Sequence, residues 1–291
     1  MADAPTVHVS GWGQNGARWL RPQSVAFTLL AEHVVPRGIA LWSGSFIEAF
    51  VRVGITAHAT RATLSRMVER DLLSRHRRGR RVYYSVTERC QKVIQDGHRR
   101  IWDVGAVKED PGTEWTILTY SLPDSWQRER HGLRSRLLWA GFGWLHPGVW
   151  IAPTAAEVIE PLLDELDLRQ HVHVFPVRPD PITDFARVVR ETYDLEGLAQ
   201  GYEGFIADWG DMPVDRPADD PLAVTLRLST EWLELLHDNP RIPLSLLPEG
   251  WPAVRAQELF RTLHAANFPA ATEVADELFE PLEDEEASRP A

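Results

Sequence analysis

The sequence lacks several features that would assign it to a class at once. Among its 291 residues there is one cysteine, Cys90, so no intramolecular disulfide can form. No stretch approaches the roughly 20 apolar residues of a membrane span, and the first 19 residues hold no apolar signal-peptide core. We therefore expect a cytoplasmic protein with no membrane partner, in which Cys90 is a small buried residue.

Motifs of catalysis and cofactor binding are also missing. No GxGxxG, P-loop, GxSxG or HExxH pattern occurs. His171 and His173 lie on one side of an expected strand and form a possible half-site for a metal. No third ligand follows at a usual spacing, so we favour two exposed histidines over a metal centre. The sequence indicates no cofactor, no metal and no enzyme.

Positive charge is scarce overall but concentrated in one segment. The net charge is −11, yet residues 18–103 contain 16 Lys or Arg and 7 Asp or Glu, a net charge of +9. The rest of the chain has 15 basic and 35 acidic residues, a net charge of −20. Such asymmetry indicates that the basic segment meets a polyanion, although a solvated basic face without a partner is the alternative.

Periodicity in the basic segment predicts three helices and a hairpin. The helices are expected over about 24–35, 46–53 and 57–73, and two β-like runs follow around Gly79. Hydroxyl side chains are placed to cap the three helices: Ser24, then Ser43 or Ser45, then Thr56. A helix, a short turn and a second helix with an exposed basic face are what entry into a major groove requires.

The third helix and the hairpin supply the candidate DNA contacts. Arg61 is the first choice for reading a guanine, because a guanidinium pairs bidentately with its O6 and N7 atoms. Neighbours on the same helical face are His58, Ala62 and Ser65, with Arg66 at the edge for a phosphate. The hairpin gathers arginines whose mutual repulsion a phosphate backbone would relieve: Arg75, Arg77, Arg78, Arg80 and Arg81.

The whole pattern predicts an α+β protein with three folded parts. After residue 112, strands and helices alternate as in a small α/β sandwich, and the segment from 181 onward is helical. The expected divisions are a flexible arm at 1–20, a winged helix-turn-helix domain at 21–106, a small α/β sandwich at 112–180, a helical domain at 181–282 and a disordered acidic tail at 283–291.

The sequence resembles the PaaX family, the repressors of phenylacetate-degradation operons. The matching segments run in family order from about residue 24 to 270: TRATLSRMVERDLLSRHRRGRRVYYSVTE, WTILTYSLPD, LRSRLLWAGFGWLHPGVWIAP, DLEGLAQGYEGFIADW and PLSLLPEGWPAVRAQELFRTL. The resemblance implies the three-part organisation, with a ferredoxin-like fold for the sandwich at 112–180, and a homodimeric repressor bound to a double-stranded operator. It also implies release by an aryl-acyl-CoA thioester such as phenylacetyl-CoA.

The central segment is also similar to the small CRISPR-associated nuclease of ferredoxin-like fold. That family has an Asp, the metal ligand, at the end of its first strand, where this chain has Ser121. A neutral hydroxyl is a poor sole ligand for a hard cation, and Asp124 falls three residues further along. We therefore expect a catalytically silent domain, and a metal-dependent nuclease is the alternative function.

An acyl-CoA effector needs cationic groups for its phosphates and aromatic groups for its acyl part. The expected central helix and the segment after it offer such side chains: Arg128, Arg130, Arg134, Arg136 and Trp144. No motif marks the pocket, so the effector, the operator and the regulated operon stay open.

Overall fold

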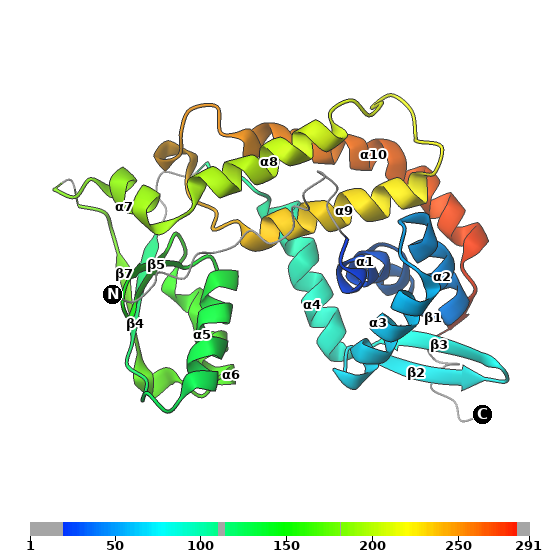
Figure 1. Ribbon diagram of the computed structural model, residues 1–291, viewed down its shortest axis with the longest axis horizontal. Coiled ribbons are helices and arrows are strands. Elements are labelled where there is room, and N and C mark those ends of the chain that lie inside the picture. Colours follow the sequence, from blue (N-terminus) through cyan, green and yellow to red (C-terminus); the bar gives the residue numbers. More distant parts are fainter. Residues whose placement is uncertain (1–19, 110–113, 181, 284–291) are drawn as a thin grey trace. The chain divides into compact units, whose positions relative to one another are not determined.

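The computed structural model describes residues 20–109, 114–180 and 182–283 (Figure 1). The predicted flexible arm, apart from Leu20, and the predicted acidic tail, apart from Glu283, lie outside these residues. Of the described residues, 20–104, 207–234 and 258–283 form one compact unit, here called the N-terminal unit. The central unit holds the described residues of 105–206 and 235–257. Each contains helices and an antiparallel sheet, so the fold is mixed α+β.

The N-terminal unit begins with helices packed on a small sheet (Figure 1). Its elements in chain order are α1 (Pro22–Leu29), a π-helical turn (Leu30–Val34), a 3-10 turn (Val35–Arg37), β1 (Ile39–Trp42), α2 (Ser43–Arg52), α3 (Ala57–Glu69), β2 (Leu73–Arg78), β3 (Arg81–Val86), α4 (Glu88–Arg99) and a second π-helical turn (Arg100–Val104). Cys90 is buried in this core, and burial raises the pKa of its thiol to about 12, as befits the small buried residue that the sequence predicts.

Two of the predicted helix caps are wrong. The first helix begins at Pro22, not after Ser24, because proline at the first helical position loses no hydrogen bond. The second begins at Ser43 with Trp42 as its N-cap and no side-chain cap. The third cap is confirmed: the Thr56 hydroxyl accepts a hydrogen bond from the Ala59 amide at 3.2 Å.

Late segments of the chain complete the N-terminal unit. Helices α8 (Leu195–Trp209), α9 (Pro221–Asp238) and α10 (Pro252–Leu278) each have residues in both units. Leu222 and Leu226 of α9 and Ala271 of α10 belong to the same buried core as α1–α3. After α10, strand β8 (Pro281–Glu283) pairs antiparallel with β1, giving the sheet order β2-β3-β1-β8. Residues more than 200 positions apart therefore share one sheet.

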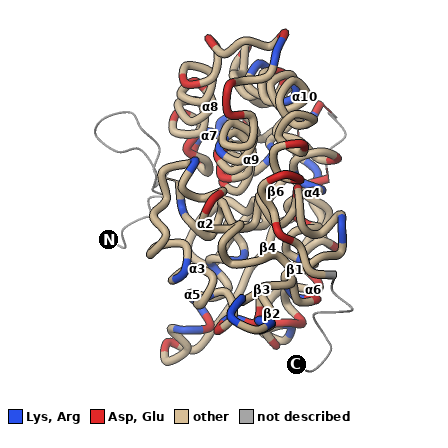
Figure 2. The backbone as a smooth tube through the Cα atoms, turned by 90° about the vertical axis from the view of Figure 1, so that its right-hand side faces the viewer, with Lys and Arg blue, Asp and Glu red and all other residues tan. Residues whose placement is uncertain are grey.

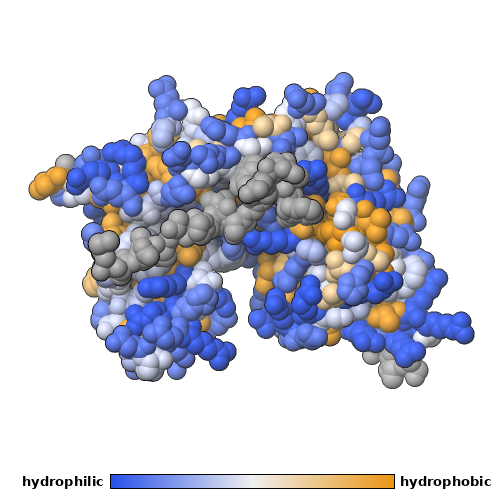
Figure 3. All heavy atoms as spheres, viewed as in Figure 1, coloured by the Kyte–Doolittle hydropathy of each residue, from blue (hydrophilic) through white to orange (hydrophobic). Residues whose placement is uncertain are grey.

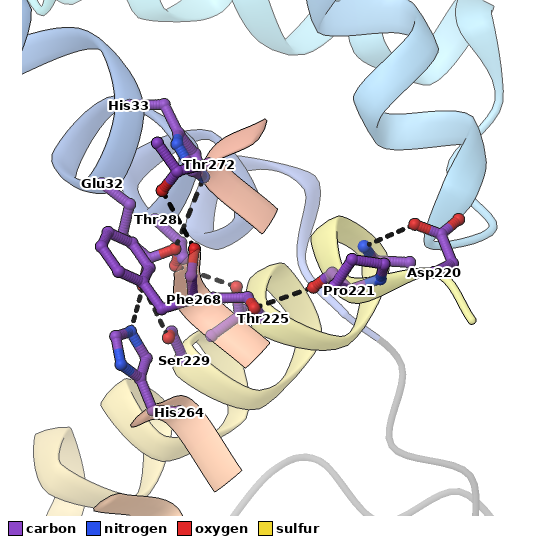
Figure 4. A network of polar contacts seen from close by, with 12 residues as sticks. Thr28, Glu32, His33, Asp220, Pro221, Thr225, Ser229, His264, Phe268 and Thr272 are labelled. Atoms are coloured by element: carbon purple, nitrogen blue, oxygen red, sulfur yellow. Dashed lines mark hydrogen bonds and ion pairs between the residues drawn. The ribbon is translucent and has the colours of Figure 1, made fainter. Parts of the chain in front are cut away.

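A buried polar layer joins the first helical segment to α9 and α10 (Figure 4). The Glu32 carboxylate accepts a hydrogen bond from the Ser229 hydroxyl at 2.7 Å and lies 3.3 Å from His264 Nε2. His33 has no exposed surface and stacks on Phe268, with ring centroids 5.9 Å apart. Neither ring nitrogen of His33 has a hydrogen-bond partner, and burial lowers its pKa.

The central unit contains a four-stranded antiparallel sheet in the order β5-β6-β4-β7. Its elements are β4 (Trp115–Tyr120), α5 (Gln127–Trp139), β5 (Gly143–His146), β6 (Val149–Ala152), a 3-10 turn (Ala156–Ile159), α6 (Glu160–Glu165), a 3-10 turn (Arg169–His171), β7 (Val172–Val177), α7 (Phe185–Thr192) and a 3-10 turn (Leu244–Leu246). Strand β5 was not predicted, because GWLH is only four residues long and reads as part of the turn before it.

Both faces of this sheet are covered by helical segments. Leu118 of β4 packs with Leu133 and Leu137 of α5, whereas Trp115 on the opposite face packs with Val189 of α7. Alternation along the strand explains the division, since neighbouring side chains point to opposite faces. Among the described helices, none is long and apolar enough to cross a bilayer.

Candidate nucleic-acid interface

Helices α2 and α3 are joined by a tight four-residue turn. The Ile55 amide donates to the Phe50 carbonyl at 2.9 Å, and Gly54 has a φ of +81°, which favours glycine. The buried Ile55 side chain then anchors the turn to the core, and Thr56 caps α3. The turn and the cap together fix where α3 begins.

Helix α3 is divided into a buried face and an exposed face, largely as predicted. Thr60, Leu64 and Met67 are fully buried, and they recur at the helical spacing of three and four residues. On the opposite face, three of the predicted DNA contacts are exposed to solvent: His58, Arg61 and Ser65. Ala62, which lies beside them, is half-buried. Arg66 is exposed and donates to the Thr63 hydroxyl at 3.1 Å, which holds it against its own helix.

The β2–β3 hairpin carries the predicted group of arginines, and Figure 2 shows Lys and Arg gathered along it. Gly79 turns the chain with a φ of +59°, and the Gly79 carbonyl accepts from Arg77 Nε at 3.2 Å. Arg75, Arg77 and Arg80 are exposed, whereas Arg78 is half-buried and has further interactions. The hairpin tip is a hydrophilic projection in Figure 3.

Arg81, in contrast, is already engaged within the protein. Its guanidinium forms an ion pair with the Glu280 carboxylate and lies over the Trp42 ring, 4.8 Å from the ring centroid. No local pattern predicts this contact, because Glu280 is 199 positions away along the chain. Arg81 thus differs from the other predicted contacts of the hairpin.

The predicted effector residues of the central unit lie along α5 and on β5. Arg136 donates to both carboxylate oxygens of Glu165, at 2.9 and 2.7 Å, and Arg130 donates to the Leu122 carbonyl at 2.8 Å. Arg134 Nε lies 3.3 Å from the Tyr120 hydroxyl, and Arg128 is exposed. Trp144 is half-buried against the α5 side of the sheet. The helix therefore has cationic groups, but three of them already form contacts within the chain.

The position that would hold a metal in a nuclease lies at the end of β4. Ser121 is exposed there, and the Asp124 side chain is fully exposed with its carboxylate 3.7 Å from Arg130. Within the described part of the chain, no cluster of three or more His, Cys, Asp or Glu is arranged for a metal ion. His171 lies in the turn before β7, not in the strand as expected, and its ring contacts Trp126.

Comparison with known proteins assigns the chain to a family. Residues 21–90 match the family described as PaaX-like protein, residues 108–189 the PaaX protein central Cas2-like domain, and residues 193–277 the PaaX-like protein C-terminal domain. The chain belongs to the PaaX family. It is 24% identical to the transcriptional repressor PaaX of Escherichia coli K12 over 259 residues, which cover 85% of this chain and 81% of that protein.

A solved structure has a fold similar to that of this chain. The uncharacterized protein Rv0674 from Mycobacterium tuberculosis superimposes with a TM-score of 0.56, covering 87% of this chain and 97% of that one at 19% identity. Membership of the PaaX family supports a transcriptional regulator rather than an enzyme. It gives no support to the nuclease alternative.

Proposed function

We propose that this protein is a transcriptional repressor that binds duplex DNA through a winged helix-turn-helix. The helix-turn-helix is formed by α2 and α3, and the β2–β3 hairpin is the wing. One observation carries the proposal: the capped helix α3 exposes His58, Arg61 and Ser65 on one face and is followed directly by an arginine-bearing hairpin. A helix in the major groove reads bases, and basic groups beside it bind the phosphate backbone.

Arg61 and the wing have different roles in this proposal. Arg61 points away from the core near the start of α3 and reads a base, so its loss relaxes specificity at one base pair at a cost of about 1–3 kcal/mol. The wing arginines neutralise phosphates, so their loss weakens binding to all sequences and reduces the salt dependence.

Binding measured by fluorescence anisotropy tests the division of roles. The probes are a duplex selected from a randomised library by the protein itself, its single-base variants and a 30-bp duplex of mixed sequence. We expect Arg61→Ala to lose discrimination at one position, and the Arg78→Ala, Arg80→Ala double variant to lose affinity on every duplex. Arg255 is an exposed arginine in the central-unit part of α10, and Arg255→Ala is the charge-matched control for Arg61→Ala. Equal loss on all duplexes for Arg61→Ala would contradict its base-reading role.

The central unit is proposed as the ferredoxin-like part that senses the effector and contributes to a homodimer. Its βαββαβ element order is that of a ferredoxin-like sandwich. The proposed effector is an aryl-acyl-CoA thioester, and it can release DNA only if it binds the free protein more tightly than the DNA-bound one. Titration calorimetry with phenylacetyl-CoA checks this: we expect Arg134→Ala to weaken binding, with Arg190→Ala on α7 as control. Unchanged affinity in both Arg134→Ala and Arg136→Ala would remove α5 from the site.

A further inference from the structure

The chain just after α10 is held in place by hydrogen bonds of the Glu280 backbone, both at its amide and at its carbonyl. The Glu280 amide donates to the buried Ser45 hydroxyl at 3.0 Å, and its carbonyl accepts from the Trp42 amide at 3.2 Å. Just before it, Phe279 is buried in the core, and just after it β8 pairs with β1. The backbone of Glu280 is therefore fixed beside Trp42, the last residue of β1, and β1 lies between it and β3.

This anchoring aims the Glu280 carboxylate at Arg81. In the hairpin register Arg81 lies opposite Arg78, at the base of the β2–β3 turn. The Arg81 side chain is half exposed, forms the ion pair with Glu280 and is stacked on Trp42. Arg81 belongs to the group of wing arginines by sequence, but its charge is compensated by a carboxylate of the same chain.

We propose that Glu280 sets the DNA affinity of the protein by competing with a DNA phosphate for Arg81. This rests on the proposed function, since it requires the wing to contact DNA. An exposed ion pair is weak in water, so a phosphate is able to compete for the guanidinium. The carboxylate also repels any phosphate that approaches Arg81. The C-terminal strand thus keeps the affinity below what the arginines of the wing would give alone.

Replacing Glu280 by Gln isolates the charge. Glutamine keeps an acceptor for Arg81 and leaves both backbone hydrogen bonds of residue 280 intact. Freeing Arg81 for one phosphate makes the slope of log K against log salt more negative by about 0.9. Between 50 and 200 mM salt, the affinity of Glu280→Gln then falls by a factor about 3.5 times larger than that of the wild type.

The experiment measures anisotropy of a labelled 30-bp duplex of mixed sequence with the full chain across this salt range. Glu277→Gln removes the same charge from an exposed residue one turn earlier on α10 and is the matched control. We expect tighter binding at 50 mM and the steeper slope for Glu280→Gln alone. We also expect Arg81→Gln to reduce the wild-type slope less than Arg80→Gln does, because Glu280 occupies Arg81 for part of the time.

Two results would overturn the inference. One is a slope for Glu280→Gln equal to that of Glu277→Gln. The other, which does not depend on how Glu280→Gln folds, is an equal reduction of slope by Arg81→Gln and Arg80→Gln, because Arg81 would then already bind DNA as fully as Arg80 in the wild type. Failure of the wild type to bind the duplex at any salt concentration would instead refute the proposed function itself.

Discussion

The cap of α3 offers a direct test of how local structure supports DNA binding. Thr56 accepts from the Ala59 amide at 3.2 Å, and Thr87 accepts from the Cys90 amide at the same distance at the start of α4. Removing such a cap costs about 1 kcal/mol. Thr87 also donates to the Asp71 carbonyl at 2.8 Å, so Thr87→Ala should lose at least as much stability as Thr56→Ala.

The two variants should differ in DNA affinity although both are destabilised. The first turn of α3 contains His58 and leads into Arg61, and DNA contact requires this turn to be ordered. If DNA binding must restore the helical turn that Thr56→Ala loosens, the free energy of the lost cap, about 1 kcal/mol, is subtracted from the binding free energy and reduces the affinity up to about fivefold. Thr87→Ala leaves α3 capped, so we expect its affinity within twofold of the wild type.

Urea denaturation and anisotropy on the selected duplex measure the two effects separately. Thr56→Ser keeps a capping hydroxyl and should restore both stability and affinity. Thr56→Asp also caps the helix and suits its dipole, but its charge repels phosphate, so stability should be kept while affinity falls. Equal losses of affinity in Thr56→Ala and Thr87→Ala would refute the reasoning, because the loss would then follow global stability and not the start of α3.

Two further predictions concern the buried polar groups of the N-terminal unit. Glu231 is 1% exposed and accepts hydrogen bonds from Trp209 Nε1 and Arg227 Nε, both at 2.8 Å. Glu231→Ala should therefore lower the free energy of unfolding by about 2–3 kcal/mol, whereas Arg227→Ala should lower it by about 0.5–1 kcal/mol because the Arg227 side chain is 45% exposed. Urea denaturation measures both losses, and equal losses would contradict the argument from burial. Burial lowers the pKa of His33; Arg37 and His264 add to this effect, and Glu32 and Asp276 oppose it. Below about pH 6.5 the unfolded chain therefore binds more protons at His33 than the folded chain does. The free energy of unfolding should keep its full value above about pH 6.5 and fall as the pH drops below it. Thermal melts should show this fall reduced in His33→Phe and kept in the exposed control His131→Gln.

The parts of the fold that the sequence predicts are those set by neighbouring residues. Thr56 was recognised as a cap because its partner is three residues away, and the faces of α3 follow from the spacing of Leu64 and Met67. Ser45 was misread as a possible cap for the opposite reason. Its hydroxyl bonds to an amide 235 positions away, and no local pattern distinguishes that partner from a helix amide.

The candidate site divides in the same way. The exposed face with His58, Arg61 and Ser65 was predictable, since it is the complement of the apolar face. Arg81 and Arg136 were assigned to external ligands because the sequence shows their charge but not Glu280 or Glu165. Strand β8 was unpredictable for a related reason. Its three residues are too few to show a periodicity, and they form a strand only because they follow α10 and lie at the edge of β1.

Glu280 is held in the N-terminal unit through the end of α10 as well as through β1. Helix α10 starts with residues of the central unit, continues through the N-terminal unit and ends one residue before Phe279 and Glu280. This helix of 27 residues contains Pro269, which interrupts its hydrogen-bond ladder because proline has no backbone N–H. Asp276 pairs with Arg37 at 2.5 Å, so the end of α10 is also tied to the turn before β1. The Asp276 ion pair on one side of Glu280 and the pairing of β8 with β1 on the other therefore oppose a displacement of the Glu280 carboxylate from Arg81.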